Sequence, residues 1–186
     1  MTRDELEHII RASADITDQY EFIIVGSQSI LGPIPHPAAV FTVSMEADIY
    51  PKDAPELAEK IDGAIGEGSQ FHETHGYYAQ GVGPETAILP KEWLSRVHRV
   101  QNANTNGRVG YCLALVDLFL SKAAAGREKD REFCMALLAH DYVKLAEVLD
   151  LVRTMPLDAQ GQRRVRAAIQ RWAKTLRDDG HDGVKA

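Results

Sequence analysis

The sequence predicts a mixed α/β (α+β) fold, in which a mixed sheet with helices precedes a C-terminal helical bundle. Residues 20–25 form an apolar run of strand length that ends at a glycine, as expected of a buried strand. Residues 40–50 are a second strand candidate, and segments of helical pattern lie before and after the two strands. From residue 112 onward the pattern is helical. Alternating strands and helices that are followed by helices alone favour this layout.

The length and composition are typical of one globular domain, or of one domain with a helical extension. The chain has 186 residues, of which 45% are hydrophobic and 26% are charged, so it can bury a substantial core. We expect an α/β core over residues 1–110 and a helical region packed on it over residues 111–186. The net charge of −6 and the pI of about 5.6 argue against broad electrostatic binding to nucleic acid, including DNA.

The chain lacks the features of an exported or membrane protein. Its first residues contain no apolar segment of the kind found in a signal peptide, and no apolar run approaches the ~18 residues of a membrane-spanning helix. Its two cysteines, Cys112 and Cys134, are too few for a disulfide framework and are expected in the core. These observations predict a cytoplasmic protein without a membrane partner.

Helices are predicted at three places near the N-terminus. Residues 3–14 follow a capping-box pattern and carry one apolar stripe. A short helix is expected near Ser27, because the proline-rich segment 33–37 cannot continue it. A third helix is expected to begin with Asp53 as its cap and to end at Gly66.

Short strand candidates follow these helices. They lie at residues 76–82, 86–89 and 96–100. Residues 101–107 then form a turn-rich loop. We therefore expect these strands to complete the sheet.

Three helices are predicted in the C-terminal part of the chain. They begin near Asp117, at Asp141 and at Asp158, and the last two aspartates are expected to be N-caps. Pro156 ends the middle helix. The apolar stripes of the last two helices are expected to pack together, and residues 178–186 are expected to fray.

Two stretches beside the first two strands predict a metal and nucleotide site. Gly26 and Ser27 follow the first strand, where a turn can present backbone N–H groups to a phosphate. Glu46 and Asp48 lie two residues apart, so the strand period of two puts both carboxylates on one face. They should repel each other unless a cation lies between them, and Mg²⁺ prefers such oxygen ligands. The alternatives are that Ser27 only caps a helix and that the two acids line a solvated strand face.

This order of strand, Gly-Ser, short helix and acid-x-acid strand resembles the nucleotidyltransferase superfamily. It is most similar to small bacterial members, which include toxins of abortive-infection and toxin–antitoxin systems. Residues 117–130 resemble the Lys…Arg…Asp block that follows in those proteins, so the resemblance covers about residues 20–140. The resemblance implies the superfamily's fold, Mg²⁺ or Mn²⁺ as the cofactor, and an NTP as the substrate.

The resemblance also implies which residues make the site. They are the nucleotide-binding Gly26, Ser27, Lys122, Arg127 and Asp130, together with the catalytic Glu46, Asp48 and Lys122, of which the two acids bind the metal. Lys122 would neutralise charge on the β- and γ-phosphates. From the residues alone, Lys122 is equally a surface lysine on an apolar helix, and Arg127 and Asp130 are equally an ion pair on a helix surface.

Two positions depart from the superfamily's pattern. The third strand candidate carries Gln80 where a third carboxylate is usual, and Glu46 stands where most members have an aspartate. Glu73 and Glu85 lie at the ends of that strand and are the candidates to replace the absent acid. The motifs of zinc proteases, serine hydrolases and Walker-type NTPases do not occur in the sequence.

Two functions follow from these observations. The first is a Mg²⁺-dependent nucleotidyltransferase that moves a nucleoside monophosphate from an NTP to an acceptor, which is RNA, a protein or a small molecule. The resemblance adds a toxin role, with an antitoxin protein as the partner. The second is a catalytically degenerate member of the same fold that binds a nucleotide or a partner without turnover, and Gln80 favours it.

Overall fold

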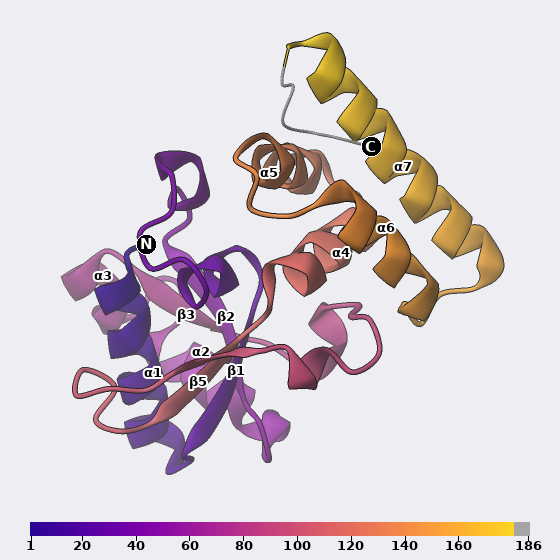
Figure 1. The fold of residues 1–186 in the computed structure, drawn as a ribbon. Helices are drawn as coiled ribbons and strands as arrows, with labels where there is room; N and C mark the ends of the chain where they lie inside the picture. Colours follow the sequence, from indigo (N-terminus) through magenta and orange to yellow (C-terminus); the bar gives the residue numbers. More distant parts are fainter. Residues whose placement is uncertain (181–186) are drawn as a thin grey trace. The chain divides into compact units, whose positions relative to one another are not determined.

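The chain folds into two units, which Figure 1 colours along the sequence. The computed structural model describes residues 1–180. The first unit contains Met1–Ala87 and Arg96–Ala114, and the second contains Ile88–Ser95 and Leu115–Ala186. The expected division after residue 110 stays a prediction. Of the end that was expected to fray, residues 181–186 lie outside the described part of the chain.

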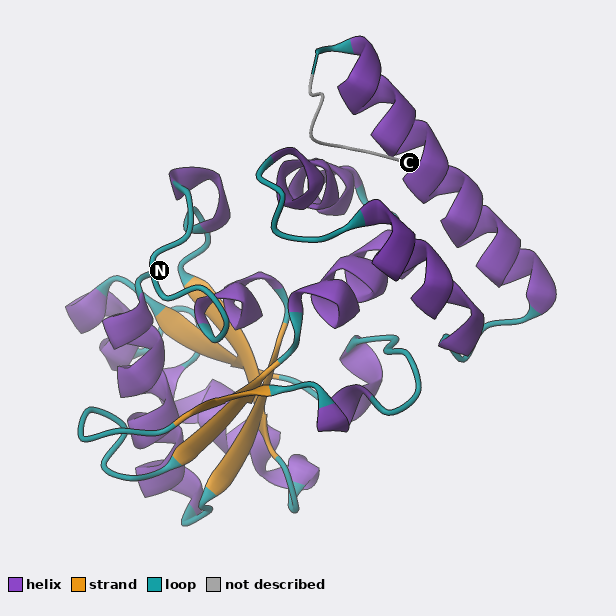
Figure 2. Cartoon of the chain, in the orientation of Figure 1, coloured by secondary structure: helices purple, strands orange, loops and turns teal. Residues whose placement is uncertain are grey.

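A mixed sheet with helices around it forms the first unit (Figure 2), which confirms the predicted fold class. Over residues 1–180 the sheet has five strands in the order β3-β2-β1-β5-β4. They are β1 (Glu21–Val25), β2 (Glu46–Pro51), β3 (Tyr78–Gly81), β4 (His98–Val100) and β5 (Val109–Cys112). β1 is antiparallel to β2 and parallel to β5, whereas β2 runs parallel to β3 and β4 antiparallel to β5.

The strand directions bring one end of each of these five strands to the same end of the sheet, and the start of β4, at His98, is opposite Cys112. Val25, the last residue of β1, is opposite Asp48 near the start of β2, and Glu46 is opposite Tyr78 at the start of β3. The carboxyl end of β5, at Cys112, lies beside the carboxyl end of β1 because these two strands are parallel. Loops that leave or enter adjacent strands at this end are therefore neighbours.

Two strand predictions are wrong. The sequence does not predict β5, because its four residues include a glycine and are too few to show alternation. No strand forms at residues 86–89 of the described chain, where Pro84–Thr86 make a 3-10 turn (η4). Prolines at both sides of that stretch cannot donate to a ladder of hydrogen bonds. β2 also begins later than expected, since Ala39–Phe41 form the 3-10 helix η2.

Helix α1 (Arg3–Thr17) confirms the first predicted helix and extends it by three residues. The predicted capping box is present: the Thr2 hydroxyl accepts from the Glu5 N–H at 3.3 Å, and the Glu5 carboxylate accepts from the Thr2 N–H at 2.7 Å. This exchange satisfies two N–H groups that a helix start otherwise leaves without partners.

The remaining helices of the first unit differ from the prediction, one in its cap and one because it was not predicted. The 3-10 helix η3 (Pro55–Leu57) precedes α2 (Ala58–Ile65), and neither has a side-chain cap, so Asp53 is not the N-cap. Pro55 already has the backbone angle of a helix start, which makes the acidic cap unnecessary. The sequence reasoning also missed α3 (Gln70–His75), a helix of less than two turns that Ser69 caps.

Helices make up the second unit. They are the 3-10 helix η5 (Trp93–Ser95), α4 (Leu115–Ala125), α5 (Glu128–Ala139), α6 (Leu145–Leu151), the 3-10 helix η6 (Val152–Thr154) and α7 (Ala159–Asp178). Asp158 caps α7 as predicted, since its carboxylate accepts from the Gly161 N–H at 2.6 Å. Asp141 does not cap α6, because it lies in a left-handed turn before Lys144 and binds that lysine.

The apolar stripe of α7 is buried as expected, and it packs with α4, α5 and α6. Phe119 and Trp172, whose ring centroids are 6.4 Å apart, join α4 to α7. Cys112 and Cys134 are both buried and free of disulfides. No helix within residues 1–180 combines the length and the apolar character that crossing a membrane requires.

Candidate functional site

Gly26 and Asp48 are in direct contact at the end of β1. Gly26 has φ +64° and ψ −167°, a backbone conformation that is almost confined to glycine. A Cβ added there would lie 2.9 Å from Cγ of Asp48 and would overlap its Oδ2. Glycine is therefore required for two separate reasons, the backbone conformation and the space that the Asp48 carboxylate occupies.

Glu46 and Asp48 lie on one face of β2, as the alternation predicts. Ala47 and Ile49 on the opposite face are fully buried, whereas both acids are partly exposed. The acids therefore point away from the core that the other face of β2 helps to form. A pair of partly exposed carboxylates at the end of a sheet is a suitable ligand set for a hard cation.

Tyr78 holds the first of these acids in place. Its hydroxyl donates to Glu46 Oε2 at 3.0 Å across the pairing of β2 with β3. Burial, and then the hydrogen bond and charge of Glu46, raise the pKa of Tyr78 to about 12. The ring of His72 lies 4.6 Å from that of Tyr78. Sequence reasoning missed Tyr78, although its place at the start of the third strand candidate was a signal once β2 and β3 were paired.

No third acid joins the pair in the described chain. Within residues 1–180, no three side chains of His, Cys, Asp or Glu gather closely enough to hold a metal ion. Gln80 is opposite Asp48, and its amide donates to Asp62 Oδ1 at 3.0 Å. Glu73 and Glu85, the expected substitutes, are exposed. The two carboxylates fit Mg²⁺ in the manner of sites in which one or two acids hold the ion together with water and substrate phosphates.

The Gly-Ser turn leads into the 3-10 helix η1 (Ser27–Leu31). Gly26 is the N-cap residue, so the alternative in which Ser27 caps this helix is wrong. The hydroxyl of Ser29, which is fully buried, accepts from the N–H of Leu113 just after β5. This bond fixes η1 against the neighbouring strand end.

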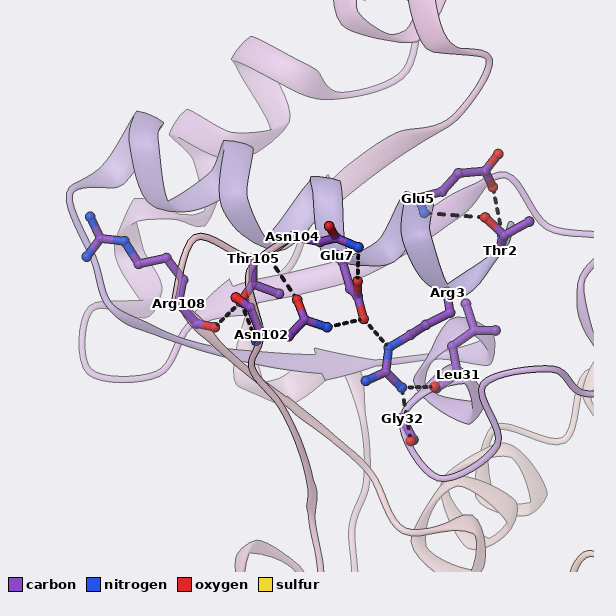
Figure 3. Close-up of polar contacts among 10 residues, drawn as sticks. All are labelled: Thr2, Arg3, Glu5, Glu7, Leu31, Gly32, Asn102, Asn104, Thr105 and Arg108. Carbon is purple, nitrogen blue, oxygen red and sulfur yellow. Dashed lines mark hydrogen bonds and ion pairs between the residues drawn. The ribbon is translucent and has the colours of Figure 1, made fainter.

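A network of polar contacts around the buried Glu7 holds the other end of η1 (Figure 3). Arg3 on α1 donates to the carbonyls of Leu31 at 2.5 Å and Gly32 at 3.2 Å, and its Nε donates to Glu7 Oε1 at 2.8 Å. Glu7 also accepts from two asparagine amides of the loop between β4 and β5, at 2.8 and 3.0 Å. These asparagines are Asn102 and Asn104. Helix α1 thus connects η1 with that loop.

Glu7 stays ionised in this network. Burial alone raises the pKa of Glu7, but the hydrogen bonds from Asn104, Asn102 and Arg3 outweigh burial and hold the pKa below its ordinary value. The sequence signal for the pair was an arginine and a glutamate four residues apart on α1. The asparagine partners, about a hundred residues away, were not visible in that signal.

In the second unit, Lys122, Arg127 and Asp130 form one ion cluster. Lys122 Nζ lies 3.1 Å from Asp130 Oδ1, and Arg127 Nε lies 2.6 Å from Asp130 Oδ2. Asp130 is fully buried, and Lys122 is buried with its ammonium 4.4 Å from the centre of the Phe133 ring. The interpretation of Lys122 as a surface lysine is therefore wrong, as is that of Arg127 and Asp130 as an isolated surface pair.

Neighbouring cations lower the pKa of Asp130 although its side chain is buried. Burial raises its pKa, but the hydrogen bond from Arg127 and the charge of Lys122 outweigh burial and hold the pKa of Asp130 below its ordinary value. The carboxylate also lies in the first turn of α5, where the helix dipole favours a negative charge.

The predicted site residues thus form two groups. The first unit brings together Gly26, Ser27, Glu46 and Asp48, and the second brings together Lys122, Arg127 and Asp130. That both groups act on one ligand stays a prediction.

Comparison with known proteins adds one finding. The model of a family described as "Nucleotidyltransferase of unknown function (DUF6036)" matches residues 4–178. No curated protein and no solved structure matches the chain.

Proposed function

The chain belongs to this nucleotidyltransferase family of unknown function, and from that premise we propose that it transfers a nucleoside monophosphate from an NTP to an acceptor, with pyrophosphate as the leaving group. The observation that carries the proposal is the contact of Asp48 with Gly26, with Glu46 on the same strand face. It sets two carboxylates beside a glycine turn at the end of a strand. This arrangement supports the proposal, because carboxylates suit a hard cation and a glycine turn can present backbone N–H groups to phosphate.

Each group of residues has a role in the proposed reaction. Gly26 and Ser27 bind the triphosphate through the turn after β1. Glu46 and Asp48 hold Mg²⁺ or Mn²⁺, and the bound ion supplies Lewis acidity at the α-phosphoryl group. Tyr78 orients Glu46 through its hydrogen bond. Catalysis by these side chains consists of positioning and charge stabilisation.

Lys122 and Arg127 supply positive charge for the β- and γ-phosphates in this proposal. Asp130 holds both cations in a fixed geometry. A lysine that is buried and oriented before substrate binds loses little side-chain entropy on binding. The acceptor in this proposal is RNA, a protein or a small molecule. A toxin role in the cytoplasm with an antitoxin partner extends the proposal on the strength of the family resemblance.

A second function is a binding module that holds a nucleotide or a partner without turnover. The observation that favours it is Gln80, which occupies the position opposite Asp48 and engages Asp62. With two acids, a single metal can be held, whereas two-metal transfer needs further ligands.

The test is transfer of label from each α-labelled NTP into total RNA and total protein, with Mg²⁺ or Mn²⁺. Wild type is compared with Asp48→Asn and with Asp15→Asn, which removes an exposed acid of α1 as a matched control. Labelled product that is lost only in Asp48→Asn supports the transferase. Saturable NTP binding without product supports the binding module. Equal NTP binding by all three proteins with metal would show that the site lies elsewhere.

A further inference from the structure

Helix α7 is basic in an acidic protein. The chain has a net charge of −6, and its first unit carries 15 acidic and 7 basic side chains. α7 instead carries six basic side chains and one acidic one, Asp178. The basic residues are Arg163, Arg164, Arg166, Arg171, Lys174 and Arg177. Such a local reversal of charge indicates a surface for a negatively charged partner.

A groove runs along one side of this helix. Its volume is about 410 Å³, and residues from the C-terminal end of α4 and from α7 line it. Small residues form its walls, with Ala123, Ala124 and Gly126 on the α4 side and Ala167 and Ala168 on α7. Walls of alanine and glycine allow another backbone to approach closely, as in tight helix–helix packing. The side chains of the buried ion cluster do not line this groove.

Two arginines stand on the rim of the groove. Arg164 and Arg171 are both exposed, and neither forms an ion pair with a residue of the described chain. They are seven residues apart, which is two helical turns or about 10 Å along α7. Carboxylates on one side of a bound helix, also two turns apart, would match this spacing.

The residues that line the groove favour a protein partner over a nucleic acid. Leu157 and Val165 complete the apolar part of the groove, which contains no aromatic residue. Single-stranded nucleic acid is bound through aromatic stacking platforms and grooves that follow the phosphate backbone. An aliphatic groove with two separated cations instead fits an amphipathic helix, whose apolar residues enter the groove and whose acids meet the rim.

We propose that the groove between α4 and α7 docks an acidic amphipathic helix of a partner protein, with carboxylates paired to Arg164 and Arg171. The apolar stripe of the bound helix covers Ala123, Ala124 and Ala168. This docking does not depend on the proposed transfer reaction, because the groove includes none of the residues assigned to that reaction.

The test uses the full chain and a displayed library of helix-forming peptides about 18 residues long, or five turns. The selected peptides should carry an apolar stripe flanked by Asp or Glu two turns apart. The double variant Arg164→Glu/Arg171→Glu should raise their Kd at least about tenfold, which is about 1.4 kcal/mol. Ala168→Leu, which fills the groove, should also abolish binding. Selection of no peptide, or of peptides without acids, overturns the proposal.

The matched control is Arg163→Glu/Lys174→Glu, which makes the same charge change at two exposed positions of α7 outside this groove. It should change the Kd by less than about twofold. If both double variants weakened peptide binding equally and a single-stranded RNA competed with the peptide, α7 would be a general surface for polyanions. That result would overturn the proposal. A dimer in light scattering that Ala168→Leu dissociates would assign the groove to a second copy and likewise overturn the proposal. Unchanged melting temperatures show that each variant is folded.

Discussion

The contact between Gly26 and Asp48 makes Gly26→Ala the most informative substitution in the first unit. The new Cβ would enter a backbone conformation that is almost confined to glycine, which costs about 1–3 kcal/mol. It would also overlap the Asp48 carboxylate, and overpacking of this kind costs a further 1–3 kcal/mol, roughly. We therefore expect the free energy of unfolding to fall by about 2–6 kcal/mol.

Gly76→Ala separates the two contributions. Gly76 has φ +76° and ψ 5°, and a Cβ there would have nothing within 4 Å. This control should lose only about 1–2 kcal/mol, the strain of a left-handed residue. Unfolding in urea, followed by circular dichroism, measures both variants. Gly26→Ala should in addition lose the rise in melting temperature that a metal-bound NTP gives the wild type.

A double-mutant cycle with Asp48→Ala tests the contact itself. That substitution removes the overlapping Oδ2 and Cγ and leaves Cβ of residue 48 at 3.4 Å, an ordinary contact. Gly26→Ala should then destabilise the protein less in the Asp48→Ala background by about 1–3 kcal/mol. The same loss in both backgrounds, or a loss no larger than that of Gly76→Ala, would refute the assignment of Gly26 to this site.

Three further predictions concern buried ionisable groups. Lys122→Met should lower the free energy of unfolding by about 3–5 kcal/mol, because it leaves the buried Asp130 with one cation fewer, and Asp130→Leu added to it should restore most of that loss. The pKa of Glu7 is lowered, so the stability that its carboxylate contributes is present above its ordinary pKa of 4.5 and is lost as the pH falls through its pKa in the folded state. Lowering the pH should therefore destabilise the wild type more steeply than Glu7→Gln. The pKa of Tyr78 is raised to about 12, so the stability that its protonated hydroxyl contributes is full below its ordinary pKa of 10.0 and is lost as the pH rises toward 12. Tyr78→Phe should lack this loss of stability at alkaline pH and the phenolate absorbance that accompanies it. Equal pH profiles of a variant and the wild type would contradict the last two predictions, and a stable Lys122→Met would contradict the first.

Local sequence signals determined the parts of the fold that depend on neighbours in the chain. The capping box at the start of α1 and the Asp158 cap of α7 require residues only three apart, and both are present. The alternation that sets Glu46 and Asp48 on one face of β2 is also local. Where a proline or a left-handed turn changed the start of a helix, as at Asp53 and Asp141, the same local reasoning failed.

Only the tertiary structure determined which residues surround the candidate site. Pairing of β1 with β2 places Asp48 against Gly26, and pairing of β2 with β3 places Tyr78 on Glu46. These pairs lie 22 and 32 residues apart in the sequence, and no periodic pattern encodes a register between separate strands. The four residues of β5 form a strand because they pair with β1 and β4, since so short a segment has no hydrophobic pattern of its own.

The ion cluster of the second unit shows the same division. The sequence determined that Lys122, Arg127 and Asp130 occur close together along the chain, but it did not predict the break between α4 and α5 near Gly126. Asp130 lies in the core only because α5 packs on α4, and its carboxylate pairs there with both cations. Burial depends on which distant surfaces meet, whereas propensity and capping depend on the adjacent backbone. The sequence therefore determined the longer elements and the residue types of the candidate site, and the tertiary structure decided the short elements and which charged groups are buried and paired.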